Sequence, residues 1–490
     1  MRFLHGSRML GVVHPGVVRP GRSILLAALA VVLAAGAAVG LAVDGGGGAR
    51  AQEPTATTPD ARAVTTLLHD HAAALLTRDR KTFTAGLDDA PAAAQFRAAQ
   101  LAAFDHTAGV PFASFDLRYN RPVLDDPSLA AARARLGDDT AGIVRADLTY
   151  AFQGVDARPA RHTLYLTVTR AADGWRLAGA DDLAAAGGPS WRGPWDFGPL
   201  VVARGASCVV LAHPASEAVT DVAAAQTLVR ALAADTDAGV TAVNGVWGTA
   251  WPQRVAVLVA AGQPELDAVA GPGYPLTGVA AVAVAEPTTS VTEGPDTAAG
   301  QRIVVSGAAV PTLTAVGRAV LLRHELTHVA TRSVTAVGMP TWVVEGFADY
   351  VGNLAGTQPP TIVAAELAAQ VAKAPQATLP TDAAFAPQAT VADGTAGGST
   401  GGDTGPSGTG TGAGATTAAV AYEQAWYAMR TVAALGGPQA PAALYRAVAA
   451  AVTAGTAPAA AVDTALRQQT GLATAAFTAR WRALVTAELT

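Results

Sequence analysis

The sequence predicts an α+β protein, because helical and strand periodicities occupy separate stretches instead of alternating along the chain. Apolar residues recur at helical spacing over 67–76, and a second helical stretch covers about 92–104. Apolar and polar residues then alternate over 144–152 and over 164–168, which is typical of strands with one buried face. Helices followed by an antiparallel sheet therefore define a predicted domain over 61–185.

The end of this domain carries a hairpin signal. Asp173-Gly174 is a turn dipeptide, and Trp175-Arg176-Leu177 begins the returning strand. The helix-then-sheet order and this Asp-Gly-Trp-Arg-Leu ending resemble the cone-shaped SnoaL-like domains. The resemblance implies an α+β cone.

Four histidines of the same region are candidates to line such a cone: His69, His71, His106 and His162. No metal-ligand spacing repeats among them. We therefore expect surface histidines or hydrogen-bonded core histidines rather than a second metal site.

Residues 186–300 mix helix and strand signals. In chain order they predict a strand over 201–211, an amphipathic helix over 218–234, a nearly continuous apolar strand over 254–259 and a polar loop over 287–300. A short strand over 302–306 follows directly before an apolar helix over 313–332. That position suggests an edge strand on which an extended peptide could lie.

The C-terminal part is interrupted by a Gly/Thr/Ala-rich tract over 386–417, which has too little apolar periodicity to fold and is expected to be a disordered insertion. Helical patterns resume after it, over 418–435, 440–451, 459–466 and 475–488.

The N-terminus predicts export. Residues 24–43 form an uncharged apolar run long enough to span a bilayer, and the tail 1–23 before it carries only basic charge. We expect a single-pass anchor with a cytoplasmic N-terminus, a flexible stalk over 44–60 and extracytoplasmic domains. Cleavage after Ala51, which would secrete the chain, is the alternative.

Bulk composition excludes some partners. The net charge is −5, and the 33 basic residues are dispersed, so the sequence gives no indication of nucleic-acid binding. Cys208 is the only cysteine and lies in an apolar run, which predicts a buried structural thiol.

The helix over 313–332 contains the motif His324-Glu325-Leu326-Thr327-His328. Positions i and i+4 lie on one helical face, so both imidazoles can bind one Zn²⁺. Glu325 is placed to act as the general base that activates water. A lone motif of this kind also occurs on packed helices with two buried histidines, so its surroundings matter.

Those surroundings supply a third ligand. A second helical segment reads Trp-Val-Val-Glu-Gly-Phe-Ala-Asp-Tyr over 342–350. Glu345 can complete the metal ligands as a carboxylate, while Asp349, one turn later on the same face, can accept the N–H of a ligating histidine and fix its tautomer.

These two motifs together resemble the gluzincin zinc peptidases, and especially their bacterial peptidase-MA-like branch. The resemblance covers 194–490 and includes the helix that begins around Tyr422. It implies that Glu345 is a zinc ligand and that Asp349 supports the ligands. Relatives stabilise the oxyanion of the reaction with a tyrosine or histidine outside the two motifs. Tyr422 is the candidate for this role here, with Tyr427 as the second choice. The alternative for Tyr422 is a purely structural role as an aromatic core residue.

The sequence therefore favours an exported or membrane-anchored zinc peptidase acting on a peptide or protein substrate. Two other functions stay open. One is a non-catalytic, zinc-containing protein that binds a cell-envelope partner, and the other is a metal-dependent hydrolase of a non-peptide bond.

Overall fold

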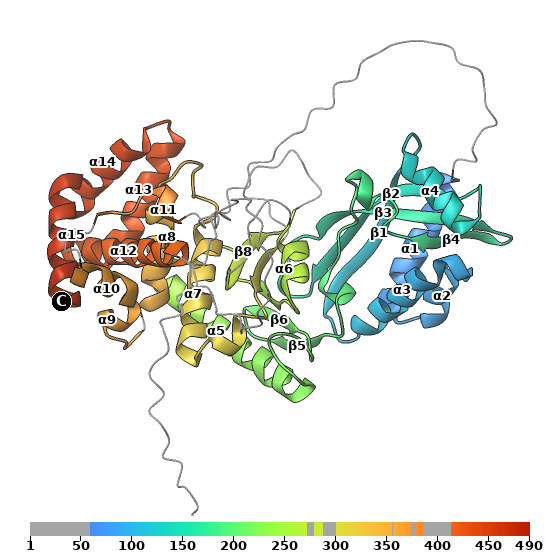
Figure 1. Cartoon of the computed structure of the whole chain (residues 1–490), viewed down its shortest axis with the longest axis horizontal. Helices are drawn as coiled ribbons and strands as arrows, with labels where there is room; N and C mark the ends of the chain where they lie inside the picture. The colour runs from blue at the N-terminus through green and yellow to red at the C-terminus, as the bar shows by residue number, and fades with distance from the viewer. Residues whose placement is uncertain (1–58, 272–278, 288–299, 355, 374–377, 386–412) are drawn as a thin grey trace, which may run out of the picture.

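The computed structural model describes residues 59–271, 279–287, 300–354, 356–373, 378–385 and 413–490 (Figure 1). The predicted tail 1–23, the apolar segment 24–43 and nearly all of the stalk 44–60 lie outside the described residues. So does most of the predicted insertion, over 386–412. Within the described part of the chain, no helix combines the length and apolar character needed to cross a bilayer.

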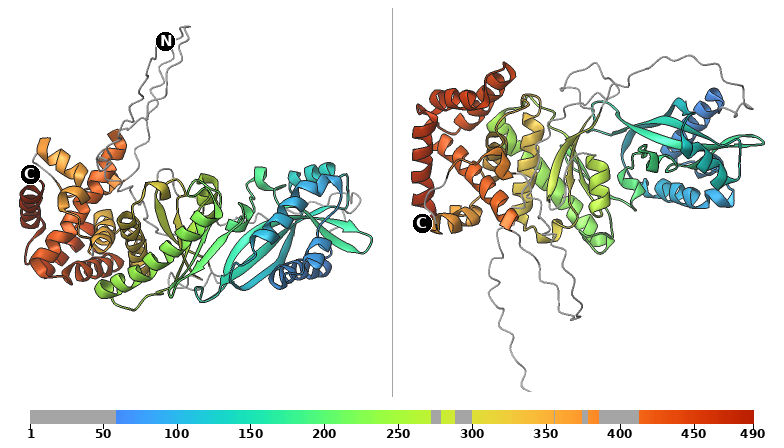
Figure 2. Two further views of the ribbon diagram at one scale, coloured as in Figure 1. Left: turned by 90° about the horizontal axis from the view of Figure 1, so that it is seen from below. Right: turned by 45° about the horizontal axis from the view of Figure 1, so that its top comes forward.

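The described chain is α+β. Figure 1 shows an N-terminal unit and a group of C-terminal helices at opposite ends, with a second sheet between them, and both views of Figure 2 keep this order.

The N-terminal unit is an antiparallel sheet covered by helices. Its helices are α1 (Ala61–Thr77), α2 (Arg80–Ala85), α3 (Ala94–His106) and α4 (Pro127–Leu136). Its strands pair in chain order and are β1 (Phe112–Val123), β2 (Gly142–Phe152), β3 (Ala160–Ala171) and β4 (Gly174–Gly179). The predicted helices, strands and β3–β4 hairpin are confirmed, and the long strand β1 was missed.

The second sheet is mixed, in the order β5-β6-β7-β9-β8. Its strands are β5 (Val201–Arg204), β6 (Cys208–Ala212), β7 (Val255–Val259), β8 (Ala281–Ala285) and β9 (Gln301–Val305). The three central strands are parallel and both edge strands are antiparallel to their neighbours.

Both faces of this sheet are buried, which explains its nearly continuous apolar strands. Val257 and Ile303 face a core shared with the helices α5 (Val222–Trp247) and α7 (Ala315–Thr331). Leu258 faces the other core, which α6 and the N-terminal unit share. Helix α6 spans Gln263–Ala270.

Helices make up the rest of the described chain. They are α8 (Thr341–Asn353), α9 (Pro360–Val363), α10 (Ala365–Lys373), α11 (Asp382–Phe385), α12 (Ala413–Gly436), α13 (Ala440–Thr453), α14 (Pro458–Thr470) and α15 (Thr474–Leu489). The last four confirm the predicted C-terminal helices.

Four sequence predictions need correction. The stretch 201–211 is not one strand but the hairpin β5–β6, because the Asp237 carboxylate accepts the N–H groups of Ala206 and Ser207 at 2.8 Å and holds a turn there. The helix expected over 218–234 instead begins after Asp221, whose side chain caps it, and runs to Trp247.

The other two corrections concern the insertion and the edge strand. The tract does not extend to 417, since α12 begins at Ala413. Strand β9 is not an edge strand but lies between β7 and β8. The peptide-binding role suggested for 302–306 is therefore wrong, because its backbone is already paired on both sides.

A buried ion network fastens the N-terminal unit to the second sheet. Arg302 of β9 is fully buried and binds both Asp156 oxygens, at 2.6 and 2.8 Å. Glu286, directly after β8, lies 3.3 Å from the Arg302 Nε, accepts the Tyr150 hydroxyl at 3.1 Å and lies 2.9 Å from the His162 Nε2. Burial alone would raise the pKa of Glu286, but His162 and Arg302 outweigh it and lower the pKa to about 2.

Removing the cation from this network should destabilise the protein strongly. We expect Arg302→Met to lower the free energy of unfolding by roughly 3–5 kcal/mol, because the Asp156 carboxylate loses its cationic partner and the Glu286 carboxylate keeps only His162 and Tyr150. Chemical denaturation measures this. Arg204→Met is the control, since Arg204 is exposed and donates to Gln153 across the same junction, without an ion pair among the described residues. It should change stability by less than about 0.5 kcal/mol. Equal effects of the two changes would contradict this account.

Candidate metal centre

Helix α7 carries the first half of the candidate site. Thr314 caps its N-terminus by accepting the Gly317 N–H at 3.0 Å. Its C-terminal half is entirely buried from His324 onward, so His324 and His328 project from the same face into the core.

Helix α8 carries the second half and lies unusually close to its neighbours. A Cβ at Gly346 would lie 2.5 Å from the Ala425 carbonyl oxygen of α12, and a Cβ at Gly352 would lie 3.2 Å from the Val320 carbonyl oxygen of α7. These two glycines let α8 pack tightly between α7 and α12. The side chain of Glu345, beside Gly346, is thereby brought to the histidines.

His324, His328 and Glu345 converge. The two Nε2 atoms are 3.0 Å apart, and the Glu345 Oε2 lies 3.4 Å from that of His324 and 3.5 Å from that of His328. Ligands of a tetrahedral zinc ion, bound at about 2.0–2.2 Å, are about 3.3–3.6 Å apart. Among the described residues, these three form the one group of His, Cys, Asp or Glu with metal-ligand proximity.

Asp349 orients one of the imidazoles. Its Oδ1 lies 2.8 Å from the His324 Nδ1, and both side chains are buried. When the Nδ1 carries the proton and donates a hydrogen bond to the Asp349 carboxylate, the Nε2 of the same ring presents its lone pair to the other two residues of the cluster. This is the contact expected from the sequence.

Glu345 is a buried charge without a close hydrogen bond. Neither of its oxygens makes a hydrogen bond of normal geometry among the described residues, and the Nε2 atoms of His324 and His328 lie 3.4 and 3.5 Å from its Oε2. Burial alone would raise its pKa, but His328 and His324 outweigh it and lower the pKa to about 2. Burial is the largest single influence on the pKa of His324 and lowers it, but Asp349, Glu345 and Glu325 together outweigh burial and hold that pKa well above its ordinary value. An ionised, buried carboxylate facing two ring nitrogens fits a divalent cation.

Glu325 stands apart from the three converging groups. It is fully buried, and neither of its oxygens has a hydrogen bond of normal geometry in the described part of the chain. Burial raises its pKa, while His324 and His328 lower it to a smaller extent. The backbone N–H of Ala283 in β8 also lowers the pKa of Glu325. A carboxylate with a raised pKa and no fixed partner is suited to proton transfer.

The structure brings Tyr422 to the site and places Tyr427 elsewhere. Tyr422 of α12 is buried against Phe385, with ring centroids 5.1 Å apart. Burial, and after it the charges of Glu345, Asp349 and Glu325, raise its pKa well above 10. The hydroxyl of Tyr427 instead donates to Glu488 of α15 at 3.3 Å, so Tyr427 belongs to the helix packing and not to the site.

Strand β8 is a neighbour that sequence reasoning missed. It is the edge strand next to α7, and the Ala283 carbonyl accepts a hydrogen bond from Arg332 at 3.0 Å. Ala280 and Glu286 pair with the β9 side, so the alternating backbone groups of Ala281, Ala283 and Ala285 point away from β9. The run of alternating Ala and Val over 281–285 was the available signal.

The remaining histidine and cysteine candidates lie outside the site. His69 lies 3.4 Å from Asp116 at the surface, the His106 Nδ1 lies 2.8 Å from the Trp195 carbonyl, and His162 belongs to the ion network. His71 is buried and stacks on Phe83. Cys208 is buried, and burial raises its pKa to about 12, as expected for an inert thiol.

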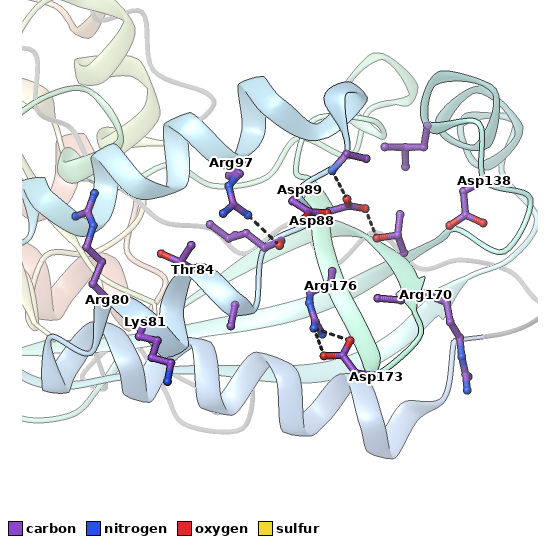
Figure 3. A pocket seen from close by; sticks show the side chains of 16 residues that line it. Arg80, Lys81, Thr84, Asp88, Asp89, Arg97, Asp138, Arg170, Asp173 and Arg176 are labelled. Carbon is purple, nitrogen blue, oxygen red and sulfur yellow. Dashed lines mark hydrogen bonds and ion pairs between the residues drawn. The ribbon is translucent and has the colours of Figure 1, made fainter.

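A hollow of about 850 Å³ on the N-terminal unit is lined by charged side chains (Figure 3). Several of its charged groups bind one another or the backbone. Arg97 donates to the Leu87 carbonyl at 3.2 Å, Arg176 binds both Asp173 oxygens at 2.7 Å, and Asp88 accepts the Ala90 N–H at 2.8 Å. We assign no function to this hollow.

Comparison with known proteins does not assign the chain to a family. No protein-family model matches the chain, and a search of curated proteins gives no significant match.

Proposed function

We propose that this protein is a zinc-dependent peptidase of the gluzincin type. The observation that carries the proposal is the buried convergence of His324, His328 and Glu345 beside a carboxylate, Glu325, that has no fixed partner. Ligands and base come from two helices packed through glycines, so their positions are held by the core rather than by a loop.

His324, His328 and Glu345 would hold the metal. Bound there, Zn²⁺ would polarise a scissile carbonyl and lower the pKa of the attacking water. Three ligands leave one position of a tetrahedral site for water or substrate, which favours a catalytic over a structural centre. Asp349 would keep the His324 ring in the ligating tautomer.

Glu325 is the proposed general base. Its burial raises the pKa of the carboxyl group towards the range in which it can both accept a proton from the attacking water and return it to the leaving amine. Tyr422 is the proposed donor to the oxyanion, because its raised pKa keeps the hydroxyl protonated among three carboxylates.

Strand β8 favours a peptide substrate over another carbonyl compound. Its outer backbone groups point away from β9, and the backbone N–H of Ala283 lies on the Glu325 side, where it lowers the pKa of that carboxyl group. An extended peptide paired along this edge would be positioned by backbone hydrogen bonds next to the base. Ala281 and Ala285 flank Ala283 on that edge.

The cellular setting is part of the proposal. The apolar segment 24–43 would anchor the chain or direct its export, with the catalytic domain outside the cytoplasm. We assign 61–185 to a SnoaL-like cone domain on its helix-covered antiparallel sheet.

The second candidate function is that of a non-catalytic, zinc-containing binding protein of the cell envelope. The extensive burial of the His324, His328 and Glu345 cluster favours this candidate.

Metal content tests the ligand assignment. The purified full-length chain should hold about one zinc per molecule by elemental analysis, and His328→Ala should lose it, because the metal keeps only two ligands. His69→Ala is the matched control, since His69 is exposed and lies outside the cluster. Zinc retained at full stoichiometry by His328→Ala would rule out these ligands.

Glu325→Gln separates catalysis from metal binding. The amide keeps the shape of the side chain but cannot accept the proton, so turnover of a fluorogenic peptide library should fall by at least roughly 10²–10⁴-fold. Zinc content should stay at one per chain. The control Glu217→Gln changes an exposed carboxylate and should leave turnover unaltered. Wild-type turnover in Glu325→Gln would exclude this residue as the base, and inactivity of the wild type with zinc bound would favour the binding protein.

Asp349→Asn should behave differently from Glu325→Gln. Losing the charge that orients His324 should weaken zinc affinity or activity by roughly 10–100-fold. Competition with a chelator of known affinity measures the first quantity and peptide turnover measures the second. If both equalled the wild-type values, the Asp349 contact would have no role in the centre.

A further inference from the structure

Strand β8 lies against α7, and the residue at the middle of its outer edge is already engaged (Figure 1). Ala283 lies between Ala281 and Ala285 on the side of β8 that points away from β9. Its N–H lies on the Glu325 side, and its carbonyl accepts a hydrogen bond from the Arg332 Nη2 at 3.0 Å. The metal-binding helix and the residue that caps it therefore face both outer backbone groups of Ala283.

Arg332 is held in place by the helix that carries the two histidines. It is the C-terminal cap of α7, and its backbone N–H donates to the His328 carbonyl at 3.1 Å. Residues four apart share one helical face, so the Arg332 side chain leaves the helix on the same side as the His328 ring. The guanidinium thus reaches the strand edge at a defined place beside the candidate metal centre.

The contact joins a buried acceptor to a half-buried cation. Ala283 is fully buried, whereas Arg332 keeps part of its surface in water. The Arg332 side chain therefore leads from the Ala283 carbonyl towards the solvent. A guanidinium in this position can leave the carbonyl for water without the cost of stranding a charge in the core.

An extended peptide on this edge needs the same carbonyl. A chain that adds to a sheet edge pairs with both the N–H and the C=O of every second edge residue. The Ala283 carbonyl belongs to the edge residue whose N–H faces Glu325, so it is the acceptor beside the proposed base. The guanidinium of Arg332 approaches it from the outer side of the strand, which is where a peptide N–H would have to lie.

We propose that Arg332 is a built-in competitor of the substrate, which an incoming peptide must displace from the Ala283 carbonyl before it can pair with β8. This inference rests on the proposed peptidase function, because it concerns access to the same centre. A peptide backbone replaces the hydrogen bond that it breaks. A carbonyl compound without an N–H group does not, so the contact favours extended peptides over other substrates.

The Michaelis constant tests the direction of the effect. Arg332→Met should lower the KM of a fluorogenic peptide by about tenfold, and change kcat less, because the peptide no longer breaks a hydrogen bond to a charged donor. Arg332→Lys keeps a donor and should stay close to the wild-type KM. Arg318→Met is the control, since Arg318 lies on the same helix and binds Asp235 at 2.7 Å, outside the centre. If the contact instead served to hold β8 in place, Arg332→Met would raise KM; a rise or an unchanged KM would overturn the inference.

A binding measurement makes the test independent of turnover. Fluorescence anisotropy of a fluorescein-labelled hexaalanine amide should show about tenfold tighter binding to Glu325→Gln/Arg332→Met than to Glu325→Gln alone. Equal or weaker binding to the double variant, or no binding to either, would defeat the role of Arg332. A zinc-loaded wild type that cleaves no peptide would defeat the proposed peptidase function instead, while the anisotropy result would still decide whether Arg332 competes for the strand edge.

Discussion

The organisation of the C-terminal part depends on burying a cluster of ionisable groups between α7 and α8. His324, Glu325, His328, Glu345 and Asp349 are all 7% exposed or less. Three carboxylates against two imidazoles leave an excess of negative charge, and each buried charge costs several kcal/mol unless it is matched. The proposed divalent cation would offset that excess. The surrounding helices would then have to pack closely enough to exclude water and hold the ligands.

The close packing is provided by residues without side chains. Gly346 and Gly352 let α8 approach α12 and α7 to distances that a Cβ would prevent. The same α12 contributes Tyr422, so the contact that fixes Glu345 also brings the tyrosine hydroxyl into the field of the carboxylates. Strand order completes the arrangement, because β8 occupies the edge beside α7 although β9 immediately precedes that helix in the chain.

The sequence predicted those features that depend on local spacing. Two histidines four residues apart on a helix, and a carboxylate pair four residues apart on the next, must each share a face, so the cluster and the His324–Asp349 contact could be anticipated. The strand order could not be anticipated, because a hydrophobic run indicates that a strand is buried but not which strands lie beside it. Strand β9 was therefore predicted to be an edge strand. The turn at Ala206 could not be predicted for a similar reason, since the carboxylate that holds it, Asp237, is 31 residues away in the chain.

The interface between the two units was also beyond sequence reasoning, and it changes the role of the N-terminal unit. The His162 ring stacks on Trp191, with centroids 3.7 Å apart, and its Nε2 lies 2.9 Å from Glu286, the residue that follows β8. Trp191 belongs to the N-terminal unit, while β8 lies beside Glu325. Packed contacts through His162 and Glu286 therefore connect the N-terminal unit to the end of the strand at the candidate metal centre. Because Glu286 has no freedom to move without breaking its contacts with Arg302 and His162, the N-terminal unit helps to fix the position of β8 and is more than a spacer.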